Sequence, residues 1–257
     1  MSFLEAAGVW VTDSRRTLLE PTSVAIGTGQ VVVVYGDPGH RHTLLALALG
    51  GRLVPSGGEL RIDADHDDAS RQRRVALVDV PGVSEPDEVI PLTTIVGEEL
   101  AMAGLPAGRS HVDEWLTENG LRPHRDDRIE DLPPGLRTVA LARLASLRPD
   151  VQFLVLALPE RSGIDSAAWF TEAAELAAAG FGVLATVSTG VALHLQRDRP
   201  DVQTVAFGNT VFHDPDEALS PRDDPGETDE PDDAPHDGPV EGGADEVAVA
   251  ATTEHEQ

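Results

Sequence analysis

Four predominantly apolar runs stand out along the chain. They occupy residues 31–35, 75–80, 153–158 and 183–187, and each consists mainly of Val, Leu and Ala. Strands that alternate apolar and polar residues have one wet face, whereas an uninterrupted apolar run is typical of a strand that is covered on both faces. The pattern therefore predicts four strands in the middle of a buried sheet.

Between these runs, apolar residues recur at helical spacing. The predicted helices cover residues 43–49, 138–147 and 166–179, and a longer helical stretch over residues 95–115 is broken at residues 104–108. Gly50 and Gly51 are suited to end the first helix, while Asp165 is a plausible N-cap and Gly180 a plausible stop for the third. Each predicted helix is thus flanked by residues that favour its ends.

At the start of the chain, apolar and polar residues alternate less regularly, and this pattern predicts shorter strands. These lie at residues 9–11 and 23–26, with an exposed strand within residues 55–63 and a last strand at residues 205–212. Strands that alternate with helices favour an α/β fold, in which a mostly parallel sheet is flanked by helices. We expect the early strands and the central helices to form small antiparallel β and helical subdomains attached to it.

Charge divides the chain into two parts. The net charge of the 257 residues is −26, of which −15 falls on residues 214–257, where sixteen acidic residues face the single Arg222. A segment rich in Pro, Gly, Asp and Glu with few bulky apolar residues buries too little surface to fold. We therefore expect a folded domain at residues 1–212 and a disordered acidic tail at residues 213–257.

Composition also excludes several kinds of chemistry. The chain has no cysteine, and all nineteen basic residues are arginine, so thiolate chemistry and a lysine phosphate clamp are impossible. A chain this acidic is repelled by nucleic-acid backbones and anionic lipids. The start of the sequence lacks the pattern of a signal peptide, and no run is long enough to insert into a membrane. We expect a cytoplasmic protein that reaches the inner face of a membrane only through a partner.

The turn after the first apolar run resembles a phosphate-binding loop. In the motif G-x-x-x-x-G-K-[ST], backbone N–H groups and a lysine surround the phosphates. The corresponding residues here are Gly36, Asp37, Pro38, Gly39, His40, Arg41, His42 and Thr43. Gly36, Gly39 and Thr43 fit, but Arg41 stands at the second motif glycine and His42 at the lysine. No spacing of His, Asp or Glu predicts a metal site.

Six stretches, taken in order over residues 4–212, are similar to the nucleotide-binding domain of ATP-binding cassette (ABC) transporters. They read GDPGHRHT, PSGGELRID, VALVDVP, LPPGLRTVALARLASLRPD, FLVLALPERSGID and GFGVLATVSTG. The resemblance implies the P-loop NTPase fold, ATP as cofactor, and a membrane-embedded transporter subunit or a second cassette as partner. Trp10 is the candidate for stacking on adenine, although a tryptophan that fills the small sheet is the simpler explanation.

The departures from the family pattern are as regular as the matches. Ala157 stands at the family's magnesium-binding aspartate and Leu158 at its catalytic glutamate. The family's loop glutamine falls on Val80, and its switch histidine falls on Gly190, or on Ser188 if the strand is shifted. The signature segment reads Leu132, Pro133, Pro134 and Gly135, in which the two prolines lack backbone N–H groups. Magnesium binding is therefore doubtful, and ATP binding is expected to be weak or absent.

Three functions are consistent with this pattern. The first is a cytoplasmic ABC-type subunit of a membrane complex that has lost efficient hydrolysis, a pseudo-ATPase, because phosphoryl transfer depends on the cations and carboxylates that are missing. The second is a working ATPase in which a displaced acid, Glu160 or Asp165, replaces the missing pair. The third is a binding module unconnected with transport that acts through its acidic tail.

Overall fold

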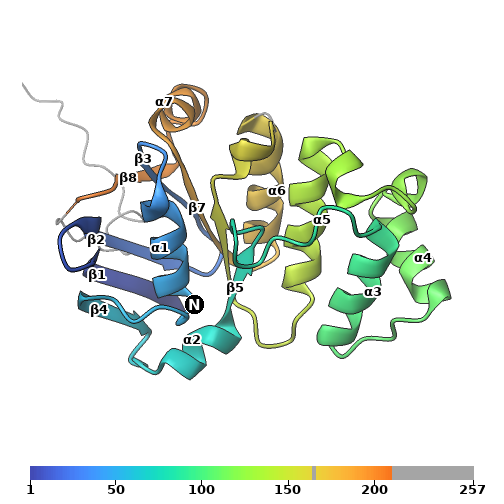
Figure 1. Ribbon diagram of the computed structural model, residues 1–257, viewed down its shortest axis with the longest axis horizontal. Coiled ribbons are helices and arrows are strands. Elements are labelled where there is room, and N and C mark those ends of the chain that lie inside the picture. The colour runs from blue at the N-terminus through green and yellow to red at the C-terminus, as the bar shows by residue number, and fades with distance from the viewer. Residues whose placement is uncertain (164–165, 210–257) are drawn as a thin grey trace, which may run out of the picture. The chain divides into compact units, whose positions relative to one another are not determined.

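A five-stranded parallel sheet forms the centre of the fold in the computed structural model, which describes residues 1–163 and 166–209 (Figure 1). Its strand order is β5-β6-β7-β3-β8. The strands are β3 (Val31–Gly36), β5 (Val75–Val78), β6 (Phe153–Ala157), β7 (Gly182–Ser188) and β8 (Gln203–Ala206). Every neighbouring pair is parallel, so the predicted α/β class with a parallel sheet is confirmed.

A smaller antiparallel sheet of order β2-β1-β4 lies beside the first. It consists of β1 (Phe3–Thr12), β2 (Thr17–Gly27) and β4 (Gly57–Ile62). Both β1 and β2 are much longer than the sequence predicted. One face of β1 is half-buried, and the register shifts around Gly8, whose φ of 57° suits glycine. This irregularity breaks the alternation that marks a strand in the sequence.

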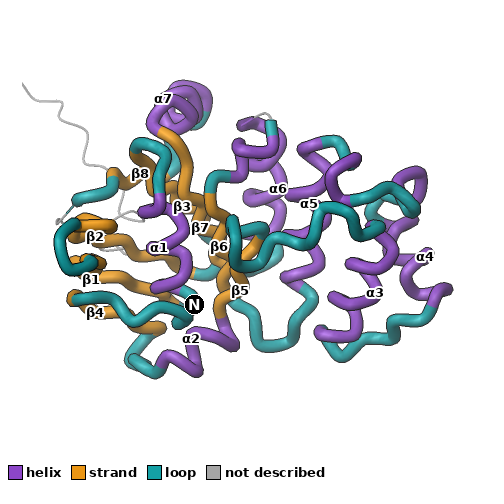
Figure 2. The backbone as a smooth tube through the Cα atoms, in the orientation of Figure 1, coloured by secondary structure: helices purple, strands orange, loops and turns teal. Residues whose placement is uncertain are grey.

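Helices cover both faces of the parallel sheet. Helix α1 (His40–Leu49) shares a buried core with the antiparallel sheet and with Val32 and Val34 of β3. The opposite face is covered by α5 (Pro134–Ser146), α6 (Ser166–Ala178) and α7 (Thr189–Asp198). The short α2 (Asp68–Arg74), capped by the Asp67 side chain, precedes β5. Figure 2 shows α1 beside the strands of the small sheet.

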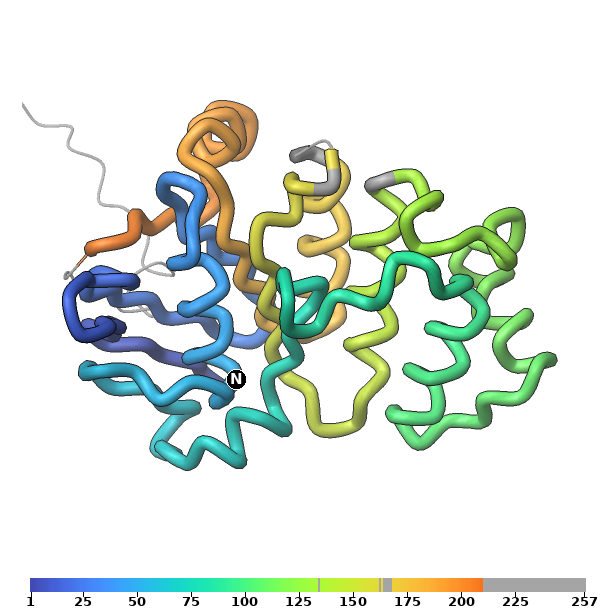
Figure 3. The backbone as a smooth tube through the Cα atoms, viewed as in Figure 1, coloured from blue at the N-terminus to red at the C-terminus, as the bar shows by residue number. Residues whose placement is uncertain are grey.

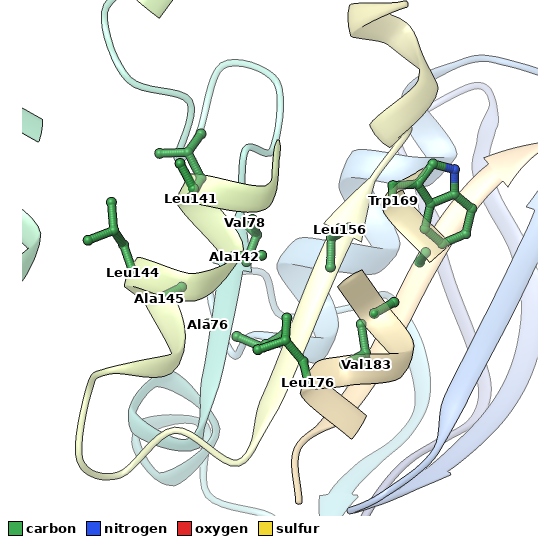
Figure 4. Packing of buried hydrophobic residues seen from close by; sticks show 14 of the residues in the cluster. Ala76, Val78, Leu141, Ala142, Leu144, Ala145, Leu156, Trp169, Leu176 and Val183 are labelled. Atoms are coloured by element: carbon green, nitrogen blue, oxygen red, sulfur yellow. The ribbon is translucent and has the colours of Figure 1, made fainter. Parts of the chain in front are cut away.

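The core on the α5 and α6 face is continuous and apolar (Figure 4). Trp169 of α6 is fully buried and belongs to one cluster with Leu156 of β6 and Val183 of β7. Leu144 of α5 extends this cluster toward β5. Burial of a side chain of this size contributes roughly 1.5–3 kcal/mol or more, so this layer holds the strand ends that carry the site.

A helical insertion follows β5. It contains α3 (Leu92–Met102), α4 (Arg109–Glu118), η1 (Arg122–His124) and η2 (Ile129–Asp131), and it returns to the sheet through α5 (Figure 3). The break predicted at residues 104–108 is the connection between α3 and α4. Leu116 of α4 and Leu92 of α3 are fully buried in the core that α5 shares, so the insertion packs as part of the same unit.

Several predicted boundaries differ from the structure. Helix α1 begins at His40 and not at Thr43, and α2 and α7 were not predicted. The last described strand, β8, ends at Ala206, whereas the sequence predicted a strand at residues 205–212. The predicted cap Asp165 and the acidic tail lie outside the described residues, so the domain boundary at residues 212 and 213 stays a prediction. None of the helices in the described part of the chain is long and apolar enough to cross a membrane.

Candidate functional site: the loop between β3 and α1

The phosphate-type loop lies at the carboxyl end of β3, in the middle of the parallel sheet. Strand β3 pairs with β7 on one side and β8 on the other, and Gly36 lies opposite Ser188. A Cβ atom at Gly36 would come within 2.9 Å of the Phe207 ring, so this position requires glycine. The loop thus occupies the crevice where nucleotides bind in sheets of this kind.

The first backbone N–H groups of α1 are available to a ligand. Within the described chain, the amides of His40, Arg41 and His42 donate to no other group, and no side chain caps the helix. Free N–H groups and the positive end of the helix dipole together favour an anion. The Asp37 carboxylate in the same loop opposes it. The loop therefore keeps the backbone part of a phosphate site with less positive charge than the usual motif.

His42 is folded against the loop and is inaccessible to solvent. Its Nε2 lies 3.1 Å from the Asp37 carbonyl oxygen, and its ring meets the Phe207 ring edge-on at a centroid distance of 4.9 Å. Burial lowers the pKa of His42 below the ordinary 6.5, more than the bond to the Asp37 carbonyl raises it. The ring is therefore neutral at pH 7, and His42 does not replace the charge of the missing lysine.

The neighbouring Arg41 already forms an ion pair within the protein. The Arg41 guanidinium pairs with Glu20 of β2 at 3.4 Å and lies 6.0 Å from the centroid of the Phe207 ring. Arg41 therefore joins the helix to the small sheet in this structure, and its charge is partly neutralised before any anion arrives.

The end of β6 has no carboxylate at the two positions where the ABC family has its magnesium-binding aspartate and its catalytic glutamate. Ala157 is buried, and Leu158 begins the turn with a left-handed φ of 51°. The next acid along the chain is Glu160, in η3 (Pro159–Ser162), whose Oε1 accepts a hydrogen bond of 2.6 Å from the Ser188 N–H. Its other oxygen, Oε2, is buried and has no partner among the described residues. The Glu160 carboxylate therefore lies beside the end of β7, three residues after Ala157, at a position other than the two that the family uses.

The two alternative switch positions lie in different places. Ser188 ends β7 directly beside Gly36 of the loop, whereas Gly190 lies within α7 with its Cα exposed. The geometry favours Ser188 as the residue that faces the loop. Thr43 lies in the first turn of α1 and is half-buried, and Val80 is fully buried in the core beneath α1.

Phe207 brings an aromatic ring to the loop, where it contacts His42, while the stacking of Trp10 on adenine stays a prediction. Trp10 lies on β1, paired with Gly57 of β4, and a Cβ atom at Gly57 would come within 2.4 Å of the indole nitrogen. Trp10 therefore covers the glycine of the neighbouring strand. Sequence reasoning missed Phe207, because the residue follows β8 and is about 170 positions from the loop that it contacts.

The signature-like segment leads into α5. Leu132 is buried, Pro133 is the N-cap, and Pro134 is the first residue of the helix, before Gly135. The amides of Leu136 and Arg137 both donate to the Pro133 carbonyl. The start of α5 therefore has fewer free N–H groups than the start of α1, because two prolines supply none and two amides are engaged.

A buried ion-pair cluster that the sequence did not predict lies beside this segment. Both carboxylate oxygens of Asp79 accept from Arg137, at 3.2 and 2.8 Å, and one also accepts from Arg161 at 3.1 Å. Arg161 further bonds the Asp79 carbonyl and pairs with Glu85 at 3.0 Å. The cluster, which we call the Asp79 cluster, ties the end of β5 to α5 and η3. Two signs of this cluster are present in the sequence: Asp79 interrupts the apolar run at residues 75–80, and Arg137 directly precedes the predicted helix at residues 138–147.

Comparison with known proteins finds similarity to ATP-binding subunits of transporters. No family model matches the chain. A zinc import ATP-binding protein, ZnuC, from Roseobacter denitrificans is 28% identical over 155 residues, which cover 60% of this chain and 56% of that protein. A hemin import ATP-binding protein, HmuV, from Rhodopseudomonas palustris is 31% identical over 138 residues, 52% of this chain and 50% of that protein.

The chain therefore spans about half the length of the curated relatives that it matches. Among solved structures, an ATP-binding subunit of an ABC transporter superposes with a TM-score of 0.58 at 17% identity, over 81% of this chain and 87% of the other. The two comparisons, by sequence and by fold, lead to the same group of proteins. The described part of this chain therefore has the fold of the nucleotide-binding domains of ATP-binding cassette (ABC) transporters, and its sequence is similar to their ATP-binding subunits.

Proposed function

We propose that this chain is the ATP-binding-cassette subunit of an import complex and that it supplies structure or regulation instead of efficient ATP hydrolysis. The assignment to import rests on the relatives, which are import ATP-binding proteins. The observation that carries the loss of hydrolysis is the end of β6, where Ala157 and Leu158 present no carboxylate to the loop. Removal of one such electrostatic element typically costs about 3–4 kcal/mol of barrier.

The residues at the loop fit a nucleotide poorly. ATP would meet the free N–H groups of α1, but the charge that usually balances the triphosphate is missing, since His42 is neutral and Arg41 pairs with Glu20. Among the described residues, the carboxylates that magnesium could use are those of Asp37 in the loop and Glu160 in η3, and neither stands at the position of the family's aspartate. Weak ATP binding with little help from magnesium is the behaviour that these contacts support.

A groove between the sheet and the helical insertion is the surface that we propose for a membrane-embedded partner. It has a volume of about 320 Å³ and is lined by Arg52, Val83, Met102 and Arg148, among others. The Met102 and Val83 side chains are 58% and 41% exposed. Burial and then the nearby Arg148 lower the pKa of Arg52. Arg148 pairs with Glu99 of the same groove at 2.8 Å, so its charge is balanced and the groove suits an apolar segment.

ATP turnover by the purified chain tests the loss of hydrolysis. We expect turnover near background for the wild type, and an increase of about 100-fold or more in the variant that combines His42→Lys, Ala157→Asp and Leu158→Glu. Thr43→Ala in that variant is the control and should remove the gain. Wild-type turnover of about 1 s⁻¹ that Thr43→Ala abolishes would contradict the proposal, whether or not the triple variant folds.

The second candidate function, hydrolysis through a displaced acid, has one observation in its favour. Glu160 is the carboxylate that is fixed at the end of β7, with one oxygen unpartnered among the described residues. If it acts as the base, Glu160→Gln should lower wild-type turnover by about 100-fold while leaving ATP affinity nearly unchanged. The alternative that acts through the acidic tail concerns residues outside the described part, and deletion of residues 214–257 tests it through loss of the partner.

A further inference from the structure

Arg41 is the only arginine of the loop at residues 36–43, and the chain contains no lysine. Its side chain is turned toward the neighbouring wall of the protein. Its Nη1 lies 3.4 Å from Oε2 of Glu20 on β2, and its guanidinium carbon lies 6.0 Å from the centroid of the Phe207 ring. The one permanent cation of the loop is therefore paired with a carboxylate of the small sheet.

The carboxylate oxygen that holds Arg41 depends on this contact. Oε2 of Glu20 is buried and makes no hydrogen bond within the described part of the chain, although the Glu20 side chain as a whole is 41% exposed. A buried carboxylate oxygen without a hydrogen bond is costly unless a cation compensates it. Departure of Arg41 would leave this oxygen uncompensated, so Glu20 binds Arg41 more firmly than a fully exposed carboxylate would.

The wall that carries Glu20 is itself fixed by hydrogen bonds. The Thr22 hydroxyl donates to the Glu20 carbonyl oxygen at 2.7 Å and accepts from the Gly208 N–H at 3.2 Å. The Phe207 N–H donates to the Tyr35 carbonyl oxygen at 2.9 Å. Strand β2 and the segment after β8 are thus joined beside the start of α1. The Glu20 carboxylate is held in place there and does not have to be ordered when it meets Arg41.

We propose that Glu20 is an autoinhibitory positioning residue, which keeps the Arg41 guanidinium on the small sheet and so weakens the binding of ATP at the loop. This proposal rests on the proposed function in taking residues 36–43 as the nucleotide site, and it adds a residue that controls the affinity of that site. Arginine forms strong, charge-assisted hydrogen bonds with phosphate oxygens. ATP therefore has to compete with Glu20 for Arg41.

The test removes the charge of Glu20 and keeps its size. In Glu20→Gln, the dissociation constant for ATP should fall by about two- to fivefold, the range expected when one partly exposed ion pair no longer opposes binding. The measurement is isothermal titration calorimetry of the full chain with ATP, without magnesium and at constant ionic strength. Local damage to the fold would weaken binding, whereas the proposal requires a gain. An unchanged or higher dissociation constant would overturn it, and so would the absence of measurable binding in both proteins.

A second pair of variants separates the position of Arg41 from the charge of Glu20. Removal of a negative charge near the loop favours an anion even if Arg41 does not move. In the Arg41→Gln background, however, Glu20→Gln should change the dissociation constant by less than about 1.5-fold, because no guanidinium remains to be released. An equal gain in both backgrounds would show that Glu20 acts through its own charge and would overturn the positioning role.

Glu5→Gln is the matched control. Glu5 lies on β1 of the same sheet and pairs with Arg61, so the substitution removes the same charge without touching Arg41, and ATP affinity should equal that of the wild type. If Glu20→Gln does not fold, Glu20→Thr replaces it, because threonine suits a strand. None of these measurements depends on turnover. Efficient hydrolysis by the wild type would overturn the proposed function and leave the comparison at Glu20 intact, while equal affinities would overturn only the role of Glu20.

Discussion

Two polar clusters lie at the carboxyl ends of the central strands, and they differ in how their polar atoms are satisfied. In the Asp79 cluster, both carboxylate oxygens are bonded by arginines from α5 and η3. Around the loop, three atoms are buried without a partner in the described part of the chain: His42 Nδ1, Thr186 Oγ1 and Glu160 Oε2. One cluster is complete in the protein alone, and the other is not.

The difference indicates that the Asp79 cluster stabilises the fold. The polar atoms around the loop are those of a ligand site, or of a site that has lost its activity. A buried ion pair with all its hydrogen bonds is strongly disrupted when one partner is removed. Unpartnered polar atoms contribute no such interaction, and replacing them by apolar groups of the same shape is nearly neutral. Stability should therefore respond steeply to changes at Asp79 and weakly to changes around the loop.

The largest effect is expected for Asp79→Asn. Asn tolerates the left-handed φ of 51° at this position, so the substitution removes mainly the charge that faces Arg137 and Arg161. We expect a loss of about 3 kcal/mol in the free energy of unfolding, measured by urea denaturation. Asp63→Asn is the matched control, because Asp63 has a φ of 57° but is exposed, and it should lose less than about 1 kcal/mol. Equal losses would contradict the distinction.

A smaller effect should appear in the pH dependence of stability. The folded-state pKa of His42 is lower than its unfolded value near 6.5, because burial disfavours the charged ring. The folded protein then binds fewer protons, so stability is lost as pH falls below about 6.5 toward the folded pKa, by at most about 1.4 kcal/mol for each pH unit.

The measurement is urea denaturation of the wild type and of His42→Gln between pH 7.5 and 5.5. The variant should lose less stability over this interval. His194→Gln, at an exposed position on α7, should keep the wild-type slope. A slope in His42→Gln that equals that of the wild type would show that the buried ring does not titrate with folding.

The smallest effect is expected for Thr186→Val. The Thr186 hydroxyl is fully buried on β7 without a partner, between Val34 and Ala157 of the neighbouring strands. Valine has the same shape, so unfolding free energy should stay within about 0.5 kcal/mol or rise slightly. Val187→Thr, which adds a hydroxyl at the next buried position of β7, should instead lose about 1–3 kcal/mol. A clear loss in Thr186→Val would mean that this hydroxyl is satisfied in the folded protein.

Much of the fold could be predicted because its strands are local patterns. Uninterrupted apolar runs identified β3, β5, β6 and β7, and residues 36–43 were recognised as a phosphate-type loop from their spacing alone. Two helices were missed: α2 is short and rich in arginine, and α7 begins directly after β7, in a stretch for which no element was predicted. The length of β1 and β2 was missed because a bulge at Gly8 interrupts the alternation.

The sequence by itself determined the composition of the site: the absence of lysine, the alanine and leucine at the end of β6, and the prolines before α5. These are chemical facts that no packing can change. Only the tertiary structure decided the partners of the residues that remain. Phe207 against His42, Glu160 on Ser188 and Arg137 on Asp79 join segments that are far apart in the chain, and such pairs form only when the strand order has brought their ends together.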